Sequence, residues 1–246
     1  MKLKNRILST AIASSAAFIS LNASAVNTYS QNFEGLDKDA VNALEADGWK
    51  IFGVDPVGQY GPFPAPNGGP AFSAIDAGQG GVDQGAQQLS IYSDYNNPNH
   101  DPIANNGPVV TRVFQEQFNN ITATDVGNTW YWSFDYKSGN IEGASTAGAF
   151  ITTLDPNNGY ASTNDFSFTT GTSDLWQSGF LSLTIDDNLI GNILQYGFQT
   201  SADLYQGSGV FYDNVSFSQT SPVPLPAAAW LFGSALAGLV AARRKK

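Results

Sequence analysis

The feature that most constrains the fold is a short segment, residues 129–137, in which aromatic and polar side chains alternate. One alternate set is entirely aromatic and consists of Trp130, Trp132, Phe134 and Tyr136. Because successive side chains of a β-strand point to opposite faces, these four rings would line one face of a strand. We expect the ring row to lie in the core of a half-buried sheet; a platform for a ligand is the alternative.

Most other apolar residues also come in short runs, which are rich in Val, Ile, Phe and Tyr and are separated by Gly, Pro, Asn and Asp. Such runs are typical of antiparallel β-strands. Further strands are predicted over 28–33, 49–54, 88–93, 109–115, 149–154, 165–169, 180–185, 194–200 and 210–218. Helical spacing is best over 38–46. The pattern predicts an all-β fold, an antiparallel two-sheet sandwich that spans residues 26–218.

The segment from Gly53 to Gly81 departs from this pattern. It contains the Gly- and Pro-rich stretch 61–70. Proline cannot join a central strand ladder, and glycine weakens one. We therefore predict a long ordered loop, packed onto the sandwich through its aromatic residues Tyr60, Phe63 and Phe72.

The N-terminus has the three parts of a secretory signal peptide. They are a basic start with Lys2, Lys4 and Arg6, an apolar stretch over 7–21, and small residues at Ala23, Ser24 and Ala25. Cleavage after Ala25 would start the mature chain at Val26, with the export machinery and signal peptidase as partners. The apolar stretch of this signal helix (1–25) is short for a membrane span of about 20 residues. A retained N-terminal anchor is the alternative.

The C-terminus is equally patterned. A Pro-rich linker over 219–226 precedes an uncharged apolar run over 227–242, and four basic residues close the chain over 243–246. The run is predicted to be a transmembrane helix whose basic end stays in the cytoplasm, because loops rich in Lys and Arg remain inside. The body of the chain would then lie outside.

The order of these three C-terminal parts resembles a PEP-CTERM sorting signal of the VPLPA type. The residues that carry the resemblance are Val223, Pro224, Leu225, Pro226 and Ala227, together with Arg243 and Arg244 in the basic cluster. The resemblance implies an exosortase-type membrane peptidase as a partner. It also implies transient anchoring in the inner membrane, followed by delivery to the cell envelope or extracellular matrix. An ordinary C-terminal anchor, which is not removed, is the alternative.

The net charge of −10 hides an asymmetry between the ends and the body. Seven of the 11 basic residues lie in the end segments, whereas all 21 acidic residues lie between Glu34 and Asp213. The body keeps four basic residues against 21 acidic ones, a net charge of −17. Such a body would not bind nucleic acid through its charge. The acidic residues could bind cations that take oxygen ligands, such as Ca²⁺; the alternative is that they only keep the protein soluble. The absence of cysteine excludes disulfides and thiol chemistry.

The two ends of the body resemble the first and last strands of galactose-binding-like jelly rolls, a fold shared by many carbohydrate-binding modules. The matching stretches are Asn32-Phe33-Glu34-Gly35 and the run from Val210 to Phe217. The resemblance implies that the first and last strands are neighbours and that Glu34 and Asp213 hold a structural Ca²⁺. The alternative is that Asp213 caps a turn and Glu34 faces water.

Catalytic motifs are scarce. The single histidine, His100, lies in a polar stretch, and the sequence has no Gly-x-Ser-x-Gly elbow, zinc motif or phosphate-binding loop. Glycoside hydrolysis needs only two carboxylates and therefore stays open. Sugar binding would use exposed aromatic rings with polar neighbours. The candidates are Tyr60, Tyr95, Tyr160, Trp176 and Tyr205, although Trp176 could equally pack on the sandwich edge.

We therefore expect an exported, non-catalytic and Ca²⁺-stabilised sandwich of the cell envelope or extracellular matrix that binds polysaccharide. Two alternatives stay open. One is a secreted carbohydrate-active enzyme with two catalytic carboxylates, and the other is a purely structural matrix protein.

Overall fold

The structure, a computed structural model, describes residues 25–55, 58–68, 72–93, 108–171, 173–202 and 206–222. The predicted leader up to Ser24, the sorting motif and the apolar run over 227–242 lie outside these residues, as do Tyr95, His100 and Tyr205. Among the described residues, no helix has the length and apolarity needed to cross a membrane.

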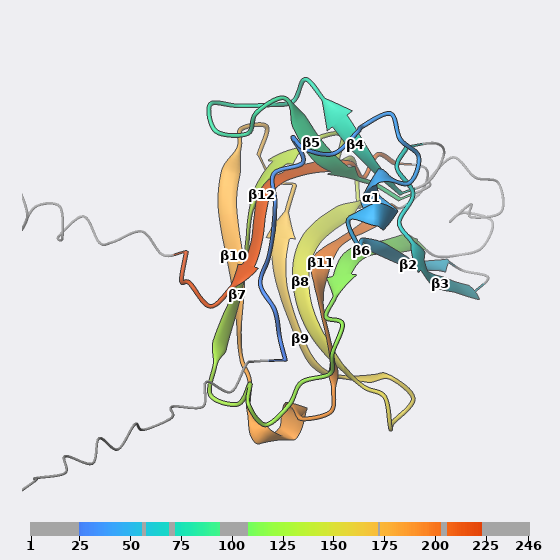
Figure 1. The fold of residues 1–246 in the computed structure, drawn as a ribbon. Coiled ribbons are helices and arrows are strands. Elements are labelled where there is room, and N and C mark those ends of the chain that lie inside the picture. Colours follow the sequence, from blue (N-terminus) through green and yellow to red (C-terminus); the bar gives the residue numbers. More distant parts are fainter. Residues whose placement is uncertain are drawn as a thin grey trace, which may run out of the picture.

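Two antiparallel sheets pack face to face (Figure 1). Sheet A has the order β10 (Gln177–Thr184), β7 (Thr129–Ser138), β12 (Val210–Ser218), β5 (Gln87–Ile91) and β4 (Ser73–Ala77), and β1 (Tyr29–Gln31) also pairs with β12. Sheet B has the order β3 (Gly58–Pro64), β2 (Lys50–Asp55), β6 (Val109–Glu116), β11 (Ile193–Ala202), β8 (Thr146–Asp155) and β9 (Ala161–Thr170). From β5 onward the chain crosses between the sheets at nearly every connection, as in a jelly roll. The expected all-β sandwich is confirmed.

Aromatic rings from the two sheets fill the core. The predicted row on β7 is buried, and none of its four rings is more than 5% exposed, which confirms its assignment to the core. The Trp132 ring lies 5.0 Å from Tyr196 and 5.3 Å from Phe198 of the opposite sheet, measured between centroids. Phe198 also stacks on Tyr212, with centroids 3.6 Å apart. These contacts fix which face of β11 and β12 points inward.

The first and last strands pair, as the jelly-roll resemblance implied. Tyr29 lies opposite Phe217 and Gln31 lies opposite Val215. Of the other predicted strands, 210–218 matches β12, whereas 165–169 covers only the C-terminal half of the longer β9. The expected helix over 38–46 is only α1 (Ala43–Ala46), preceded by turns and without a side-chain hydrogen bond at its N-cap.

The prediction of a loop over 53–81 is wrong, because this segment contains β3 and β4. Both are terminal strands in their sheets, and an edge strand tolerates proline because one row of its N–H groups needs no partner. Tyr60 on β3 lies over Gly53 on β2, where a Cβ would come within 1.7 Å of the ring. The expected packing holds for Tyr60 and Phe72, whose centroids are 5.4 Å apart, but Phe63 is 57% exposed.

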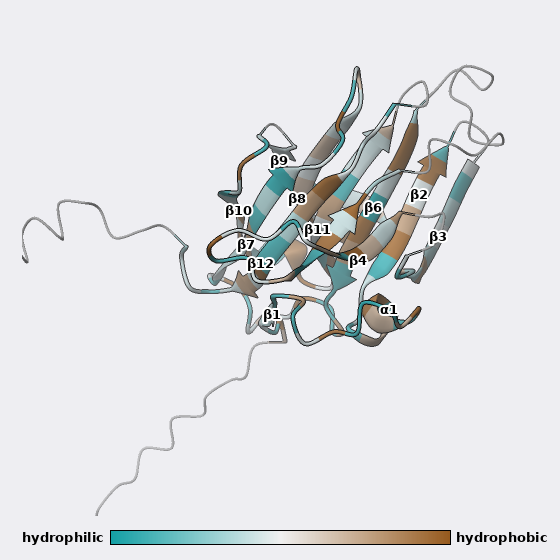
Figure 2. Cartoon of the chain, turned by 90° about the horizontal axis from the view of Figure 1, so that it is seen from above, coloured by the Kyte–Doolittle hydropathy of each residue, from teal (hydrophilic) through white to brown (hydrophobic). Residues whose placement is uncertain are grey.

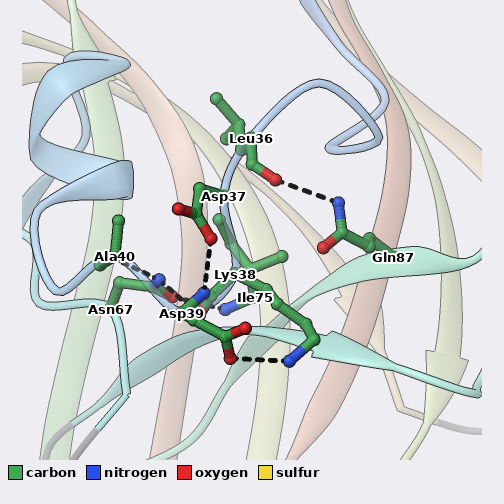
Figure 3. A network of polar contacts seen from close by, with 8 residues as sticks. All are labelled: Leu36, Asp37, Lys38, Asp39, Ala40, Asn67, Ile75 and Gln87. Atoms are coloured by element: carbon green, nitrogen blue, oxygen red, sulfur yellow. Dashed lines mark hydrogen bonds and ion pairs between the residues drawn. The ribbon is translucent and has the colours of Figure 1, made fainter.

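A buried asparagine fastens the segment between β1 and α1 to sheet A (Figure 3). The Asn67 side-chain amide donates to the carbonyls of Lys38 and Ala40, at 3.0 and 2.8 Å, and its oxygen accepts the N–H of Ile75 at 2.7 Å. Beside this network, Gln87 donates to the Leu36 carbonyl at 3.0 Å. The connection that follows Glu34 is therefore held against β4 and β5.

Candidate functional site

The outward face of sheet B carries an aromatic floor. Figure 2 shows the six strands of this sheet as one row, from β9 to β3. Phe114, Gly197 and Phe150 stand side by side on β6, β11 and β8. Their neighbours Val113 and Ala149 belong to the core, so the two phenylalanines point away from it. Their ring centroids are 6.5 Å apart.

The two rings approach each other because Gly197 stands between them. A Cβ at this position would lie 2.3 Å from the Val113 carbonyl oxygen and 2.6 Å from the Phe114 Cα. Any side chain would therefore disturb the β6–β11 pairing as well as the aromatic floor. The glycine is needed here because the backbones of β6 and β11 lie too close together for a side chain at this position.

Arg112 is held over this floor by three contacts. Its guanidinium lies 4.7 Å from the centre of the Phe150 ring. Its Nε donates to Gln199 Oε1 at 2.7 Å, and its Nη2 lies 3.6 Å from Asp165 Oδ2. A guanidinium stacked on an aromatic face and tied at two edges is oriented in advance of any ligand.

Glu116 lies two residues after Phe114 on the same face of β6, and hydrogen bonds also fix its side chain. Lys50 Nζ donates to its Oε1 and Gln195 Nε2 donates to its Oε2, both at 2.7 Å. The outward face therefore holds Arg112, Glu116 and Gln195 in a preset arrangement, with Arg112 over the Phe150 ring.

A groove of about 730 Å³ runs over this face. Its lining residues are Phe52, Gln59 and Pro62 from β2 and β3; Arg112, Phe114 and Glu116 from β6; Ile193 and Gln195 from β11; and Leu154, Gly159 and Tyr160 from β8 and the following turn. Tyr160 is 62% exposed. The volume falls within the range of sites that bind small molecules, and the lining combines apolar surface with a few fixed polar groups.

The five aromatic candidates from the sequence do not gather in one place. Tyr160 lines the groove. Tyr60 packs against the core, with its hydroxyl 3.3 Å from Thr111 Oγ1. Trp176 is half-buried on the sandwich edge, where its indole N–H donates to the Gln79 carbonyl at 2.8 Å. Tyr95 and Tyr205 lie outside the described residues.

Sequence reasoning missed Arg112, Phe114, Glu116 and Gln195. The available signal was the period of two along β6, where Arg112, Phe114 and Glu116 share one face. The apolar pair Val113-Phe114 masked this signal, because two consecutive apolar residues do not tell which of them faces the core.

A second site centres on Asp213 of β12. Its side chain is completely buried. Oδ1 accepts the N–H of Asn214 at 2.6 Å, whereas Oδ2 has no hydrogen-bond partner among the described residues. Burial raises the pKa of Asp213 to about 7; the Asn214 N–H opposes this shift, and the negative charges of Asp135 and Glu34 add to it. The two predicted metal ligands, Glu34 and Asp213, thus lie close enough for their charges to interact.

The neighbouring carboxylates are partly engaged. Glu34 Oε1 accepts the backbone N–H groups of Ala86 and Gln87, both at 2.7 Å. Asp135 accepts from Ser178 at 2.6 Å, and through its other oxygen from Gln84 and Asn214 at 2.8 and 2.9 Å. The described part of the chain holds no group of three or more His, Cys, Asp or Glu side chains that could hold a metal ion. A cation here would need main-chain oxygens as well.

Comparison with known proteins gives similarities of shape only. No family model and no curated protein matches the chain. An apo-form cyclase from Fischerella sp. is 14% identical over 77% of this chain and 95% of its own, with a TM-score of 0.46. The CBM22-2 xylan-binding domain of Paenibacillus barcinonensis Xyn10C is 12% identical over 78% and 99%, with a TM-score of 0.44.

The enzymatically active domain of tailspike protein 4 from bacteriophage CBA120 is 10% identical, with a TM-score of 0.44. The similarity covers 74% of this chain but only 21% of the tailspike chain. With TM-scores below 0.5, these similarities carry no residue role over to this chain.

The raised pKa of Asp213 predicts a pH-dependent stability for the protein in EDTA. The folded protein keeps this carboxyl protonated up to pH about 7, whereas the ordinary pKa is 3.8. The folded state therefore binds more protons between these values, and its stability falls as the pH rises from about 4 to 7. Urea unfolding at several pH values measures this slope.

Asp213→Asn, which resembles the protonated carboxyl, should flatten the slope, whereas Asp187→Asn at an exposed position should leave it unchanged. Equal slopes in the wild type and in Asp213→Asn would contradict the assignment.

Proposed function

We propose that this sandwich is a non-catalytic module that binds polysaccharide in the groove over sheet B. The observation that carries the proposal is the combination of Phe52, Phe114 and the exposed ring of Tyr160 with fixed polar side chains in one groove. Sugar rings offer apolar C–H faces that stack on aromatic rings and hydroxyls that hydrogen-bond to polar side chains. Preset side chains lose little conformational entropy when a ligand binds.

The charges near the groove favour binding over hydrolysis. A glycoside hydrolase needs one carboxyl held protonated as a general acid and a second carboxylate opposite it. Glu116 is paired with Lys50, and Asp165 lies beside Arg112. Among the residues that line the groove, Glu116 is the single carboxylate, whereas the reaction needs two.

Affinity electrophoresis or calorimetry with neutral plant and bacterial polysaccharides tests this function. Tyr160→Ala and Gln195→Ala should each weaken binding by roughly tenfold, equivalent to about 1.4 kcal/mol, because each removes one contact with the ligand. Leu175→Ala is the matched control, since Leu175 is 76% exposed and lies outside the groove.

Absence of binding by the wild type, or unchanged binding by both groove variants, would contradict the proposal. Release of reducing sugars would support the alternative of a carbohydrate-active enzyme.

We also propose that Glu34 and Asp213 hold a structural Ca²⁺. The support is chemical: a buried carboxylate oxygen of Asp213 lacks a hydrogen-bond partner among the described residues, and Glu34 acts on it electrostatically. Calcium takes six to eight oxygen ligands, which backbone carbonyls can complete. The bound ion would neutralise the clustered negative charge and fasten the segment after β1 to β12.

Calcium removal should therefore lower the melting temperature. Anything that binds only the folded state at about 100 times its Kd adds roughly 2.7 kcal/mol, a shift on the order of 5–10 °C for a chain of this size. EDTA should produce this shift in the wild type and in Asp187→Ala, but not in Asp213→Ala. Unchanged melting of the wild type in EDTA would remove the metal proposal.

The end segments support a further proposal, namely export through the leader over 1–25 and sorting through the VPLPA motif and basic tail. An exosortase-type peptidase would process the transiently anchored chain and deliver it to the envelope or matrix. This location would bring the groove into contact with extracellular polysaccharide.

Mass spectrometry of the envelope fraction should find a chain that starts at Val26. Deletion of residues 222–246 should release the sandwich into the medium with an unchanged melting temperature, because β12 ends at Ser218. A chain that starts at Met1 would contradict the leader, and retention of the truncated chain in the membrane would contradict the tail assignment.

A further inference from the structure

The start of the described chain lies against a buried carboxylate. The backbone N–H groups of Ala25 and Val26 both donate to Asp125 Oδ1, at 3.0 and 3.2 Å. Asp125 is completely buried, and the Val26 side chain is 2% exposed within the core. The peptide bond between Ala25 and Val26 is the one that the predicted leader cleavage would cut.

Asp125 is held rigidly for this contact. Its other oxygen, Oδ2, accepts both the backbone N–H and the hydroxyl of Thr122 at 2.8 Å. Its own N–H donates to the Thr122 carbonyl at 3.0 Å. The turn therefore fixes the carboxylate plane and leaves Oδ1 directed at the N-terminal segment.

The next residue is fixed as well. The N–H of Asn27 donates to Gln117 Oε1 at 2.8 Å, and Gln117 Nε2 donates back to the Asn27 carbonyl at 3.0 Å. Gln117 also donates to the Tyr196 hydroxyl at 3.2 Å, which ties it to the core. Since Val26 is anchored by its side chain and by Asn27, its nitrogen stays beside Asp125 after the residues before it are removed.

We infer that Asp125 is the binding site for the α-ammonium of the mature chain. The inference rests on the proposed export and on cleavage after Ala25. Hydrolysis of the Ala25–Val26 bond consumes one water; the carboxylate stays on Ala25 with the leader, and Val26 keeps the nitrogen as an ammonium. The single N–H of Val26 that faces Asp125 thereby becomes a cation with three donors. An ion pair between the ammonium and the carboxylate replaces two hydrogen bonds from uncharged backbone donors.

This arrangement also sets an order of events. A peptidase must take the chain around its cleavage site into its own active site, yet Val26 is buried in the folded sandwich. Cleavage therefore precedes docking of the N-terminus, and the ion pair forms only in the processed protein. Docking then fastens the N-terminal segment to the 122–125 turn in a way that the precursor cannot reproduce.

The test compares Asp125→Asn in two forms of the full chain. One form is processed normally, and the other carries Ala23→Lys, which removes the small residue needed for cleavage. Asparagine keeps the shape and the acceptor but loses the charge, so the processed form should lose on the order of 5–10 °C in melting temperature, because one partner of a buried ion pair is neutralised. The uncleaved form should lose less than half of that. Equal losses in the two forms would overturn the inference.

A second measurement does not depend on the folding of a variant. The α-amine of the processed wild type should react with acetic anhydride at pH 7 at least tenfold more slowly than that of the peptide Val-Asn-Thr. Insertion of one glycine before Val26 should restore fast labelling, because it moves the amine away from Asp125. Labelling of the wild type at the peptide rate would overturn the inference, even if the chain starts at Val26. A start at Met1 would instead overturn the export on which it rests.

Discussion

Phe198 of β11 stacks on Tyr212 of β12, with ring centroids 3.6 Å apart, and this contact joins the two sheets. It also determines which side chains of these two strands point into the core and which point outward, toward the candidate sites. Once Phe198 and Tyr196 point inward on β11, Gln195, Gly197 and Gln199 must point outward. A shift of one residue would exchange the two sets, place the glutamines in the core and expose the rings. The aromatic core thus determines both the stability of the sandwich and the chemistry of its outer face.

The sequence predicted the parts of the fold that depend on alternation within one strand. The aromatic row of β7 is of this kind, whereas the pairing of β1 with β12 was implied by the jelly-roll resemblance. It did not reveal β3, because Pro62 and Pro64 are unfavourable in a strand unless that strand lies at an edge, and edge position is a property of the assembled sheet.

The groove could not be predicted for a related reason. Phe52, Arg112, Tyr160 and Gln195 come from four separate segments, and only the register of sheet B places them together. The approach of Glu34 to Asp213 could be predicted, because Glu34 follows β1, Asp213 lies on β12, and the jelly-roll resemblance implied that these two strands are neighbours. Nothing in the sequence showed that Trp176 would use its indole N–H to bind the Gln79 carbonyl, since that contact depends on how the sandwich edge packs.

Gly197 has a consequence for how such a groove can change. The floor between Phe114 and Phe150 is set by the backbone separation of β6, β11 and β8, not by the choice of a side chain. The two rims, by contrast, come from the edge strand β3 and from the turn that carries Tyr160, where side chains are exposed. Substitutions at these rims alter the width and polarity of the entrance while the sheet beneath keeps its register. The floor of the groove is therefore fixed by the sheet, whereas its rims can change without a new fold.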